Sequence, residues 1–260
     1  MTGETSAAAM VGAMTGKAAL VTGAASGLGR ATAIALAQAG AVLCLVDINA
    51  DGLEEIAGQV RALGGQAVIH AANLAEVAQC EAAVAVAVQA FGRLDALCNV
   101  AGLISFSHSA QMPVVDWDRT IAVNLSAPFH LSRTAIPHLL ERDGAIVNVA
   151  SSAAFIGEAY AAAYCASKAG LIGMTKAMAM EYMHQPIRIN AVAPGGMATN
   201  IAASLKMPEG ADMALIKRFS GMRGLVETGD VAAMIAHLAS DAGRAFHGAC
   251  VTMDRGITAG

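Results

Sequence analysis

The amino-acid sequence predicts one doubly wound α/β domain, in which a seven-stranded parallel sheet carries helices on both faces. Seven short apolar runs alternate with longer, Ala-rich stretches that suit helices. No linker or charge run interrupts this alternation, so we expect residues 15–260 to form a single domain. A glycine-rich segment follows the first run, and polar residues follow several others. Open α/β sheets bind ligands at these strand ends.

The expected elements follow the chain in order. The strands are the apolar runs at residues 17–22, 41–46, 66–71, 94–99, 145–150, 187–193 and 249–253. Helices are expected to end near residue 39 and to span about 50–63, 75–91, 114–123, 125–141, 160–183 and 228–240. Asn124 should fall at a break between two helices, which would free its carbonyl and side chain. Residues 196–220 lose periodicity and are expected to form a flexible, apolar lid over a substrate.

Composition excludes several classes of protein. Hydrophobic residues make up 56% of the 260 residues, but polar residues interrupt every apolar stretch before the roughly 18 residues that a membrane-spanning helix needs. A net charge of −4 without a basic run argues against nucleic acid as a partner. Five scattered cysteines are typical of reduced core thiols and a cytoplasmic protein, and the histidines show no metal-ligand spacing. Residues 1–14 lack the basic region of a signal peptide and are expected to be a mobile tail.

The segment from Ser151 to Lys168 holds the candidate catalytic residues. Tyr164 and Lys168 are four residues apart in a predicted helix, so both lie on one helix face. A nearby ammonium favours phenolate, which would lower the pKa of the tyrosine and make it a general acid/base. Ser151 follows a predicted buried strand. The alternative is a tyrosine on a core-facing stripe beside a solvated lysine.

A glycine-rich turn, Gly23 to Gly29, joins the first strand to the first helix. Its backbone N–H groups would lie at a helix N-terminus, where a pyrophosphate is stabilised. Asp47 ends the second strand, and a carboxylate there can bind both ribose hydroxyls and repel a 2′-phosphate. Because Ser26 occupies the loop position where a basic residue could hold that phosphate, NAD is favoured over NADP. The alternatives are an ordinary tight turn and an N-cap role for Asp47.

These motifs resemble those of the short-chain dehydrogenase/reductase family from about Lys17 to Gly260. Thr22 to Gly29 is similar to its T-G-x-x-x-G-x-G loop, and Asn190 to Gly195 is similar to the segment that lines its nicotinamide. The sequence departs from the family pattern at Val100, Asn73 and Arg255, where the family usually has Asn, Asp and Gly. The resemblance implies a Rossmann-like fold and the catalytic residues Asn124, Ser151, Tyr164 and Lys168. The implied cofactor-binding residues are Gly23, Ser26, Gly27, Leu28, Gly29, Asp47, Ile48, Asn73, Leu74, Asn99, Ala101, Gly102, Tyr164, Lys168, Pro194, Gly195, Met197 and Thr199.

The resemblance and the residue chemistry together imply an NAD-dependent oxidoreductase that interconverts a secondary alcohol and a ketone, with an apolar or cyclic substrate expected. One alternative is a reductase of 3-oxoacyl thioesters on a carrier protein, which would favour NADPH and a basic docking patch. Another is a catalytically silent dinucleotide-binding protein. The resemblance also implies a homotetramer or homodimer built on the helices at 125–141 and 160–183. Small residues there (Ala161, Ala162, Ala163, Ala169 and Ala177) would allow close approach.

Overall fold

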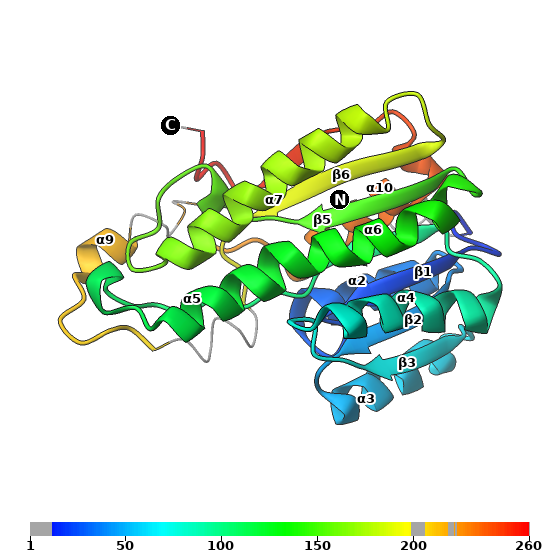
Figure 1. Ribbon diagram of the computed structural model, residues 1–260, viewed down its shortest axis with the longest axis horizontal. Helices are drawn as coiled ribbons and strands as arrows, with labels where there is room; N and C mark the ends of the chain where they lie inside the picture. The colour runs from blue at the N-terminus through cyan, green and yellow to red at the C-terminus, as the bar shows by residue number, and fades with distance from the viewer. Residues whose placement is uncertain (1–11, 199–205, 218–220, 222, 260) are drawn as a thin grey trace.

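The computed structural model describes residues 12–198, 206–217, 221 and 223–259 (Figure 1). These residues contain a seven-stranded sheet in the order β3-β2-β1-β4-β5-β6-β7, and every pair of neighbouring strands is parallel. The predicted fold class is therefore confirmed. The strands are β1 (Ala18–Thr22), β2 (Val42–Asp47), β3 (Ala67–Ala71), β4 (Ala96–Asn99), β5 (Gly144–Val149), β6 (Ile187–Pro194) and β7 (Cys250–Met253).

Helices cover both faces of this sheet. One face carries α4 (Val77–Phe91), α6 (Ala127–Leu140) and α7 (Ala162–Glu181), which lie in front of the strands in Figure 1. The other carries α2 (Gly27–Gln38), α3 (Ala50–Ala62) and α10 (Thr228–Ala239). The shorter helices α5 (Val114–Ile121) and α9 (Met213–Lys217) lie beyond the carboxyl ends of the strands, away from the body of the sheet.

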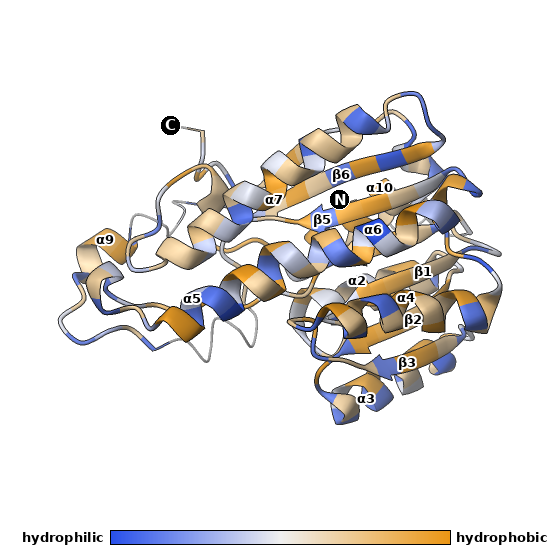
Figure 2. Ribbon diagram, in the orientation of Figure 1, coloured by the Kyte–Doolittle hydropathy of each residue, from blue (hydrophilic) through white to orange (hydrophobic). Residues whose placement is uncertain are grey.

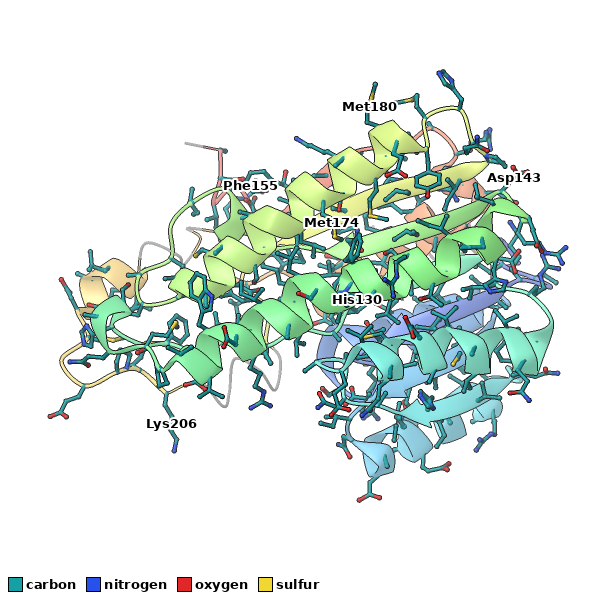
Figure 3. All side chains as sticks on the ribbon, in the orientation of Figure 1. His130, Asp143, Phe155, Met174, Met180 and Lys206 are labelled. Carbon is teal, nitrogen blue, oxygen red and sulfur yellow. The ribbon has the colours of Figure 1, made fainter. Side chains whose placement is uncertain are left out.

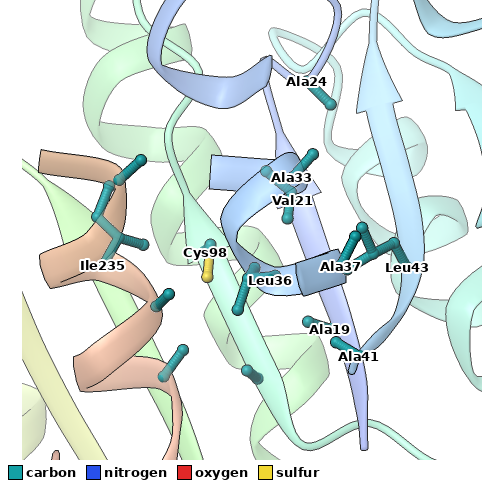
Figure 4. Close-up of a cluster of buried hydrophobic side chains, with 14 of the residues drawn as sticks. Ala19, Val21, Ala24, Ala33, Leu36, Ala37, Ala41, Leu43, Cys98 and Ile235 are labelled. Carbon is teal, nitrogen blue, oxygen red and sulfur yellow. The ribbon is translucent and has the colours of Figure 1, made fainter. Parts of the chain in front are cut away.

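Alternate residues of the strands form two hydrophobic cores. Ala19 and Val21 of β1 pack with Leu36 of α2 and Ile235 of α10 (Figure 4), whereas Leu20 packs with the α4 and α6 side. Successive strand side chains point to opposite faces, so a strand buried on both sides reads as a continuous apolar run. Figure 2 shows mainly hydrophobic colour along the strands, with blue polar positions on β5 and β6, and a mixed pattern on the helices. The length of the apolar runs thus explains why the strands were predictable.

The ordered domain begins earlier than the sequence indicated. Met14, which we expected in the mobile tail, is fully buried, and its N–H donates to the carbonyl of Ala39 (2.8 Å). Burial of its apolar side chain stabilises this position. Residues 1–11 of the expected tail lie outside the described residues.

The expected helix break at Asn124 is wrong. Residues Ala122–Ser126 form a π-helical turn that joins α5 to α6 without interruption. Such turns insert an extra residue into a continuous helix and are frequent at functional sites. Among the described residues, no helix is long and apolar enough to cross a membrane.

Candidate active site

A pocket of about 350 Å³ lies at the carboxyl ends of the central strands. This volume is within the range of small-molecule sites. Most of the residues predicted from the sequence line it: Gly23, Ser26, Gly27, Leu28, Gly29, Asp47, Ile48, Asn73, Leu74, Ala101, Gly102, Ser151, Tyr164, Lys168, Pro194, Gly195 and Met197. Thr199 lies outside the described residues. Segments far apart in the chain therefore meet where a doubly wound sheet binds its ligand.

The glycine-rich turn leaves backbone donors at one wall of the pocket. The first hydrogen bond of α2 runs from the Arg30 N–H to the Ser26 carbonyl (3.1 Å), so residues 27–29 have no partner of this kind within the helix. The Ser26 side chain makes no capping hydrogen bond. A Cβ at Gly29 would lie 2.0 Å from the Gly23 carbonyl oxygen, and one at Gly23, where φ is 69°, would lie 2.8 Å from the Ala101 Cα. The close packing requires glycine at both positions and shapes a cradle that fits a pyrophosphate.

Asp47 supports this turn from the end of β2. One carboxylate oxygen accepts from the Ala25 N–H (3.1 Å) and the other from the Asn49 N–H (3.0 Å). The N-cap of α3 is Asn49, whose side chain accepts from the Gly52 N–H (3.1 Å). The alternative of Asp47 as the helix cap is therefore wrong. Each Asp47 oxygen retains a lone pair for a further donor.

Asn73 and Asn99 differ in their relation to the pocket. Asn73 lines it, but its amide also accepts from the Ala75 N–H (3.2 Å) and donates to Glu76 (3.0 Å). Asn99 is not among the residues that line the pocket, and its contact with the cofactor stays a prediction. Asn99 is buried, and its side-chain amide donates to the Asn148 side chain (2.8 Å) in the core.

Ser151, Tyr164 and Lys168 converge beyond β5. The Ser151 hydroxyl accepts from the Ala153 N–H (3.2 Å), and Ser151 and Tyr164 both line the pocket. Lys168 is buried, donates to the Val149 carbonyl (2.7 Å) and lies 5.8 Å from the centre of the Tyr164 ring. The alternative of a solvated lysine is therefore wrong, because this ammonium is enclosed at the pocket.

Burial dominates the proton equilibria of this group. Burial raises the pKa of Tyr164 to about 12, and the neighbouring Ser151 side chain opposes that rise. Burial also lowers the pKa of Lys168 to about 8. We expected Lys168 to lower the pKa of Tyr164. In this structure the effect of burial is larger, because removal from water disfavours the charged form of each group. Two adjacent groups with displaced pKa values are typical of functional sites.

Asn124 is fully buried in the π-helical turn. Its Oδ1 accepts from the Leu103 N–H (2.9 Å), and its Nδ2 donates to the Leu103 carbonyl (2.8 Å) and to Ser167 (3.1 Å). We expected a free side chain, and this is wrong. Its hydrogen bonds hold the backbone of Leu103, in the segment after β4. A Cβ at Gly102 would lie 3.4 Å from the Asn124 Oδ1 and 3.3 Å from the Lys168 Nζ, so these two polar atoms flank the Gly102 backbone.

Several pocket residues were not predicted. Most are apolar neighbours of the motifs, for which the sequence offered no separate signal. The sequence offered no signal either for Arg119, which projects from α5 four residues before Val123. The unpredicted lining residues are Ala72, Val100, Leu103, Ile104, Arg119, Val123, Val149 and Ala150.

A parallel doubly wound sheet with a glycine-rich first turn defines a Rossmann-like domain of the class that binds dinucleotides. The family model "short chain dehydrogenase" matches residues 17–210. The chain belongs to the short-chain dehydrogenase/reductase family, a family of oxidoreductases whose fold binds a nicotinamide dinucleotide.

Three relatives illustrate the range of activities in this family. The chain is 38% identical to D-threitol dehydrogenase of Mycolicibacterium smegmatis, covering 94% of this chain and 93% of the relative. It is 37% identical to a 3-oxoacyl-(acyl-carrier-protein) reductase of Thermotoga maritima, with 93% and 98% coverage. It is 39% identical to cyclohexanol dehydrogenase of an Acinetobacter species, with 86% and 88% coverage.

Two solved structures with similar folds contain different cofactors. Carveol dehydrogenase from Mycobacterium avium, in complex with NAD, is 27% identical, with a TM-score of 0.86 and coverage of 96% of this chain and 100% of that chain. A short chain dehydrogenase from Burkholderia cenocepacia, in complex with NADP, is 32% identical, with a TM-score of 0.85 and coverage of 94% and 98%. The fold therefore accommodates either dinucleotide.

Proposed function

We propose that the protein is an NAD-dependent oxidoreductase that interconverts a secondary alcohol and a ketone. The observation that carries this proposal is the convergence of Ser151, Tyr164 and Lys168 on one pocket that also contains Asp47. The nicotinamide, when bound, supplies the hydride acceptor or donor. The unpaired N–H groups at the start of α2 and the glycine cradle fit its pyrophosphate.

The polar residues divide the work of proton transfer. Tyr164 removes the alcohol proton as phenolate, and Ser151 donates a hydrogen bond to the substrate oxygen, where charge develops. Lys168 stabilises the phenolate and would hold the nicotinamide ribose. Asn124 holds the Leu103 backbone in place and would hold a water that links Lys168 to solvent as a proton relay.

Asp47 supports NAD as the cofactor. Its two oxygens each retain a lone pair for a ribose hydroxyl, and its charge opposes a 2′-phosphate. Arg119 and Lys168 are the only basic residues among those that line the described pocket, and neither is a sequence neighbour of Asp47. The N-cap of α3 is provided by Asn49, so capping does not account for Asp47.

The substrate is an apolar or cyclic alcohol. Leu103, Ile104 and Met197 give the pocket apolar surface near Ser151 and Tyr164. The cyclohexanol dehydrogenase relative supports this substrate class, and the threitol dehydrogenase relative extends it to hydroxylated substrates.

Deuterium transfer tests the reaction directly. A secondary alcohol carrying deuterium on its carbinol carbon is incubated with the protein and NAD, and both products are analysed by mass spectrometry. We expect a ketone and deuterated NADH in equal amounts. Ketone formed without deuterium in the nicotinamide would contradict hydride transfer.

Glu158 gives the reaction a specific pH dependence. Burial raises the pKa of Glu158 to about 7, and its charge contributes to the raised pKa of Tyr164. Glu158→Gln is therefore expected to lower the pKa of Tyr164 and to move the alkaline rise of alcohol oxidation to lower pH. Because Glu158 is charged only above about pH 7, the two profiles should diverge above that pH. Profiles of kcat/KM test this, with Glu158→Asp as the control that keeps the charge. Coincident profiles for wild type and Glu158→Gln would contradict the effect.

A second candidate function is reduction of 3-oxoacyl thioesters, which the Thermotoga maritima relative supports. NADPH with acetoacetyl-CoA is the assay that separates it from alcohol oxidation. We expect much slower turnover in this assay than with NAD and a secondary alcohol.

We also propose a homodimer or homotetramer that uses an exposed face of α7. Ala162, Ala169, Gly173 and Ala177 are exposed on this helix, and a Cβ at Gly173 would meet no atom of this chain within 4 Å. Ala161 and Ala163 are buried within the chain, so their expected role between subunits is wrong. Figure 3 shows Met180 projecting outward from the far end of α7 and Met174 toward His130 of α6.

Free cysteines throughout the chain support a reducing compartment such as the cytoplasm.

An interface through α7 can be tested by the mass of the oligomer. Gly173→Glu places a charge in the small-residue face and is expected to convert the oligomer to monomers, as measured by light scattering after size-exclusion chromatography. Gly58→Glu is the matched control, because Gly58 is an exposed glycine on α3 at which a Cβ would also meet no atom within 4 Å, and it should leave the oligomer intact. An unchanged mass for Gly173→Glu would remove α7 from the interface.

A further inference from the structure

Tyr160 has a strained backbone immediately before the helix that carries Tyr164. Its φ is 67°, in the left-handed region that a bulky residue rarely adopts. The turn around it is closed by a hydrogen bond from the Ala161 N–H to the Glu158 carbonyl (3.2 Å). A backbone conformation of this kind persists only where its surroundings hold it in place.

Contacts from two other segments hold Tyr160. Its carbonyl accepts from the Ser107 N–H (2.8 Å), and its hydroxyl accepts from the Asp212 N–H (2.8 Å). The His108 ring meets the Tyr160 ring edge to face, with 5.1 Å between centroids. Tyr160 therefore joins the loop after β4 to the segment that contains α9.

His108 makes a second connection to the same segment. Its Nε2 donates to the Glu209 carbonyl (2.9 Å). Tyr160 and His108 thus bind backbone groups at two positions, Glu209 and Asp212, which fixes both the location and the direction of residues 206–217. We call residues 206–217 the docking segment.

The same residues connect to the pocket wall. Leu103 and Ile104 line the pocket and belong to the loop whose Ser107 is bonded to Tyr160. Tyr164, four residues after Tyr160 and in the first turn of α7, lines it as well. Tyr160 is not itself a lining residue, so its effect on a substrate would be indirect.

We propose that Tyr160 is a positioning residue that docks residues 206–217 onto the loop after β4 and thereby holds Leu103 and Ile104 of that loop in place relative to Tyr164. This inference goes beyond the proposed reaction, and only its kinetic consequence rests on that reaction. The strained backbone of Tyr160 serves to aim its carbonyl and its hydroxyl at two different segments.

Tyr160→Phe tests the docking without any need for turnover. The variant removes the acceptor for the Asp212 N–H but keeps the ring against His108. One hydrogen bond of this kind corresponds to roughly 2–10-fold in a local opening equilibrium. Deuterium uptake by residues 206–217 is expected to rise by about that factor, and so is trypsin cleavage after Lys206, which is exposed and projects outward in Figure 3.

Tyr182→Phe is the matched control, because it removes a tyrosine hydroxyl at the other end of the same helix. Its deuterium uptake in residues 206–217 should equal that of the wild type. Tyr160→Gly relieves the backbone strain and removes both side-chain contacts, so it should show faster uptake still. Equal uptake in wild type and Tyr160→Phe would overturn the docking role.

The kinetic consequence is measured separately with cyclohexanol as the probe substrate. Tyr160→Phe is expected to raise KM for the alcohol by about 2–10-fold, while kcat and NADH affinity stay near wild type. A fall in kcat with unchanged KM would overturn the positioning role. If wild type fails to oxidise the probe, the proposed function is in question, and the exchange and proteolysis results still decide the docking role.

Discussion

Tyr164→Phe is expected to reduce alcohol oxidation by about 10²–10⁴-fold, the usual contribution of a positioned general acid/base. Phenylalanine keeps the ring against Lys168 but has no proton to exchange with the substrate. The loss should appear in kcat, because the ring is unchanged in size and the pocket retains its shape. Initial rates of NADH formation measure the effect.

NADH binding controls for the integrity of this variant. The dissociation constant, measured by fluorescence titration, should stay within about threefold of wild type, since the pyrophosphate cradle lies at α2 rather than at Tyr164. Cys165→Ala, a substitution of the next residue, should retain most of the activity. Turnover near the wild-type rate in Tyr164→Phe would exclude Tyr164 as the acid/base.

Asp47→Ala is expected to weaken NAD binding by roughly 10–100-fold, the range for a lost hydrogen bond to a charged group. Its effect on NADP should be opposite in sign, because removal of the carboxylate removes repulsion of the 2′-phosphate. Adding Ile48→Arg should favour NADP further, since Ile48 is 68% exposed at the pocket edge and an arginine there can reach a phosphate. The ratio of kcat/KM for the two dinucleotides measures the change.

Two further variants separate charge from support of the glycine-rich turn. Asp47→Asn removes the charge and retains an oxygen that can accept from the Ala25 N–H, so it should change cofactor preference with less loss of stability. Asp51→Ala removes an exposed carboxylate on α3 outside the pocket and should leave the preference unchanged. An unaltered NAD-to-NADP ratio in Asp47→Ala would refute the role of Asp47.

The sheet could be predicted because its central strands are buried on both faces and read as mainly apolar runs, such as Leu43 to Val46. It also predicted which residues meet at the pocket, because glycine spacing and polar strand ends mark positions that a parallel sheet brings together. Each of these signals lies within a few neighbouring residues, so it can be recognised without knowing which distant residues it contacts.

The remaining features depend on contacts between distant residues. Hydrogen bonds join Asn124 to Leu103 and Asn99 to Asn148, and these partners are 21 and 49 positions apart in the sequence. The raised pKa of Tyr164 reflects burial, which i,i+4 spacing with Lys168 does not reveal. Tyr160 gave no signal because neither its positive φ nor its contact with Asp212 follows from the residue types around it.

The most direct test of the account compares initial rates with NAD and NADP across a panel of linear and cyclic secondary alcohols. We predict turnover with at least one alcohol, a higher kcat/KM with NAD than with NADP, and loss of that turnover in Tyr164→Phe. No turnover with any alcohol in the panel, while NADH still binds, would contradict the proposed reaction. A preference for NADP would contradict the assignment of Asp47.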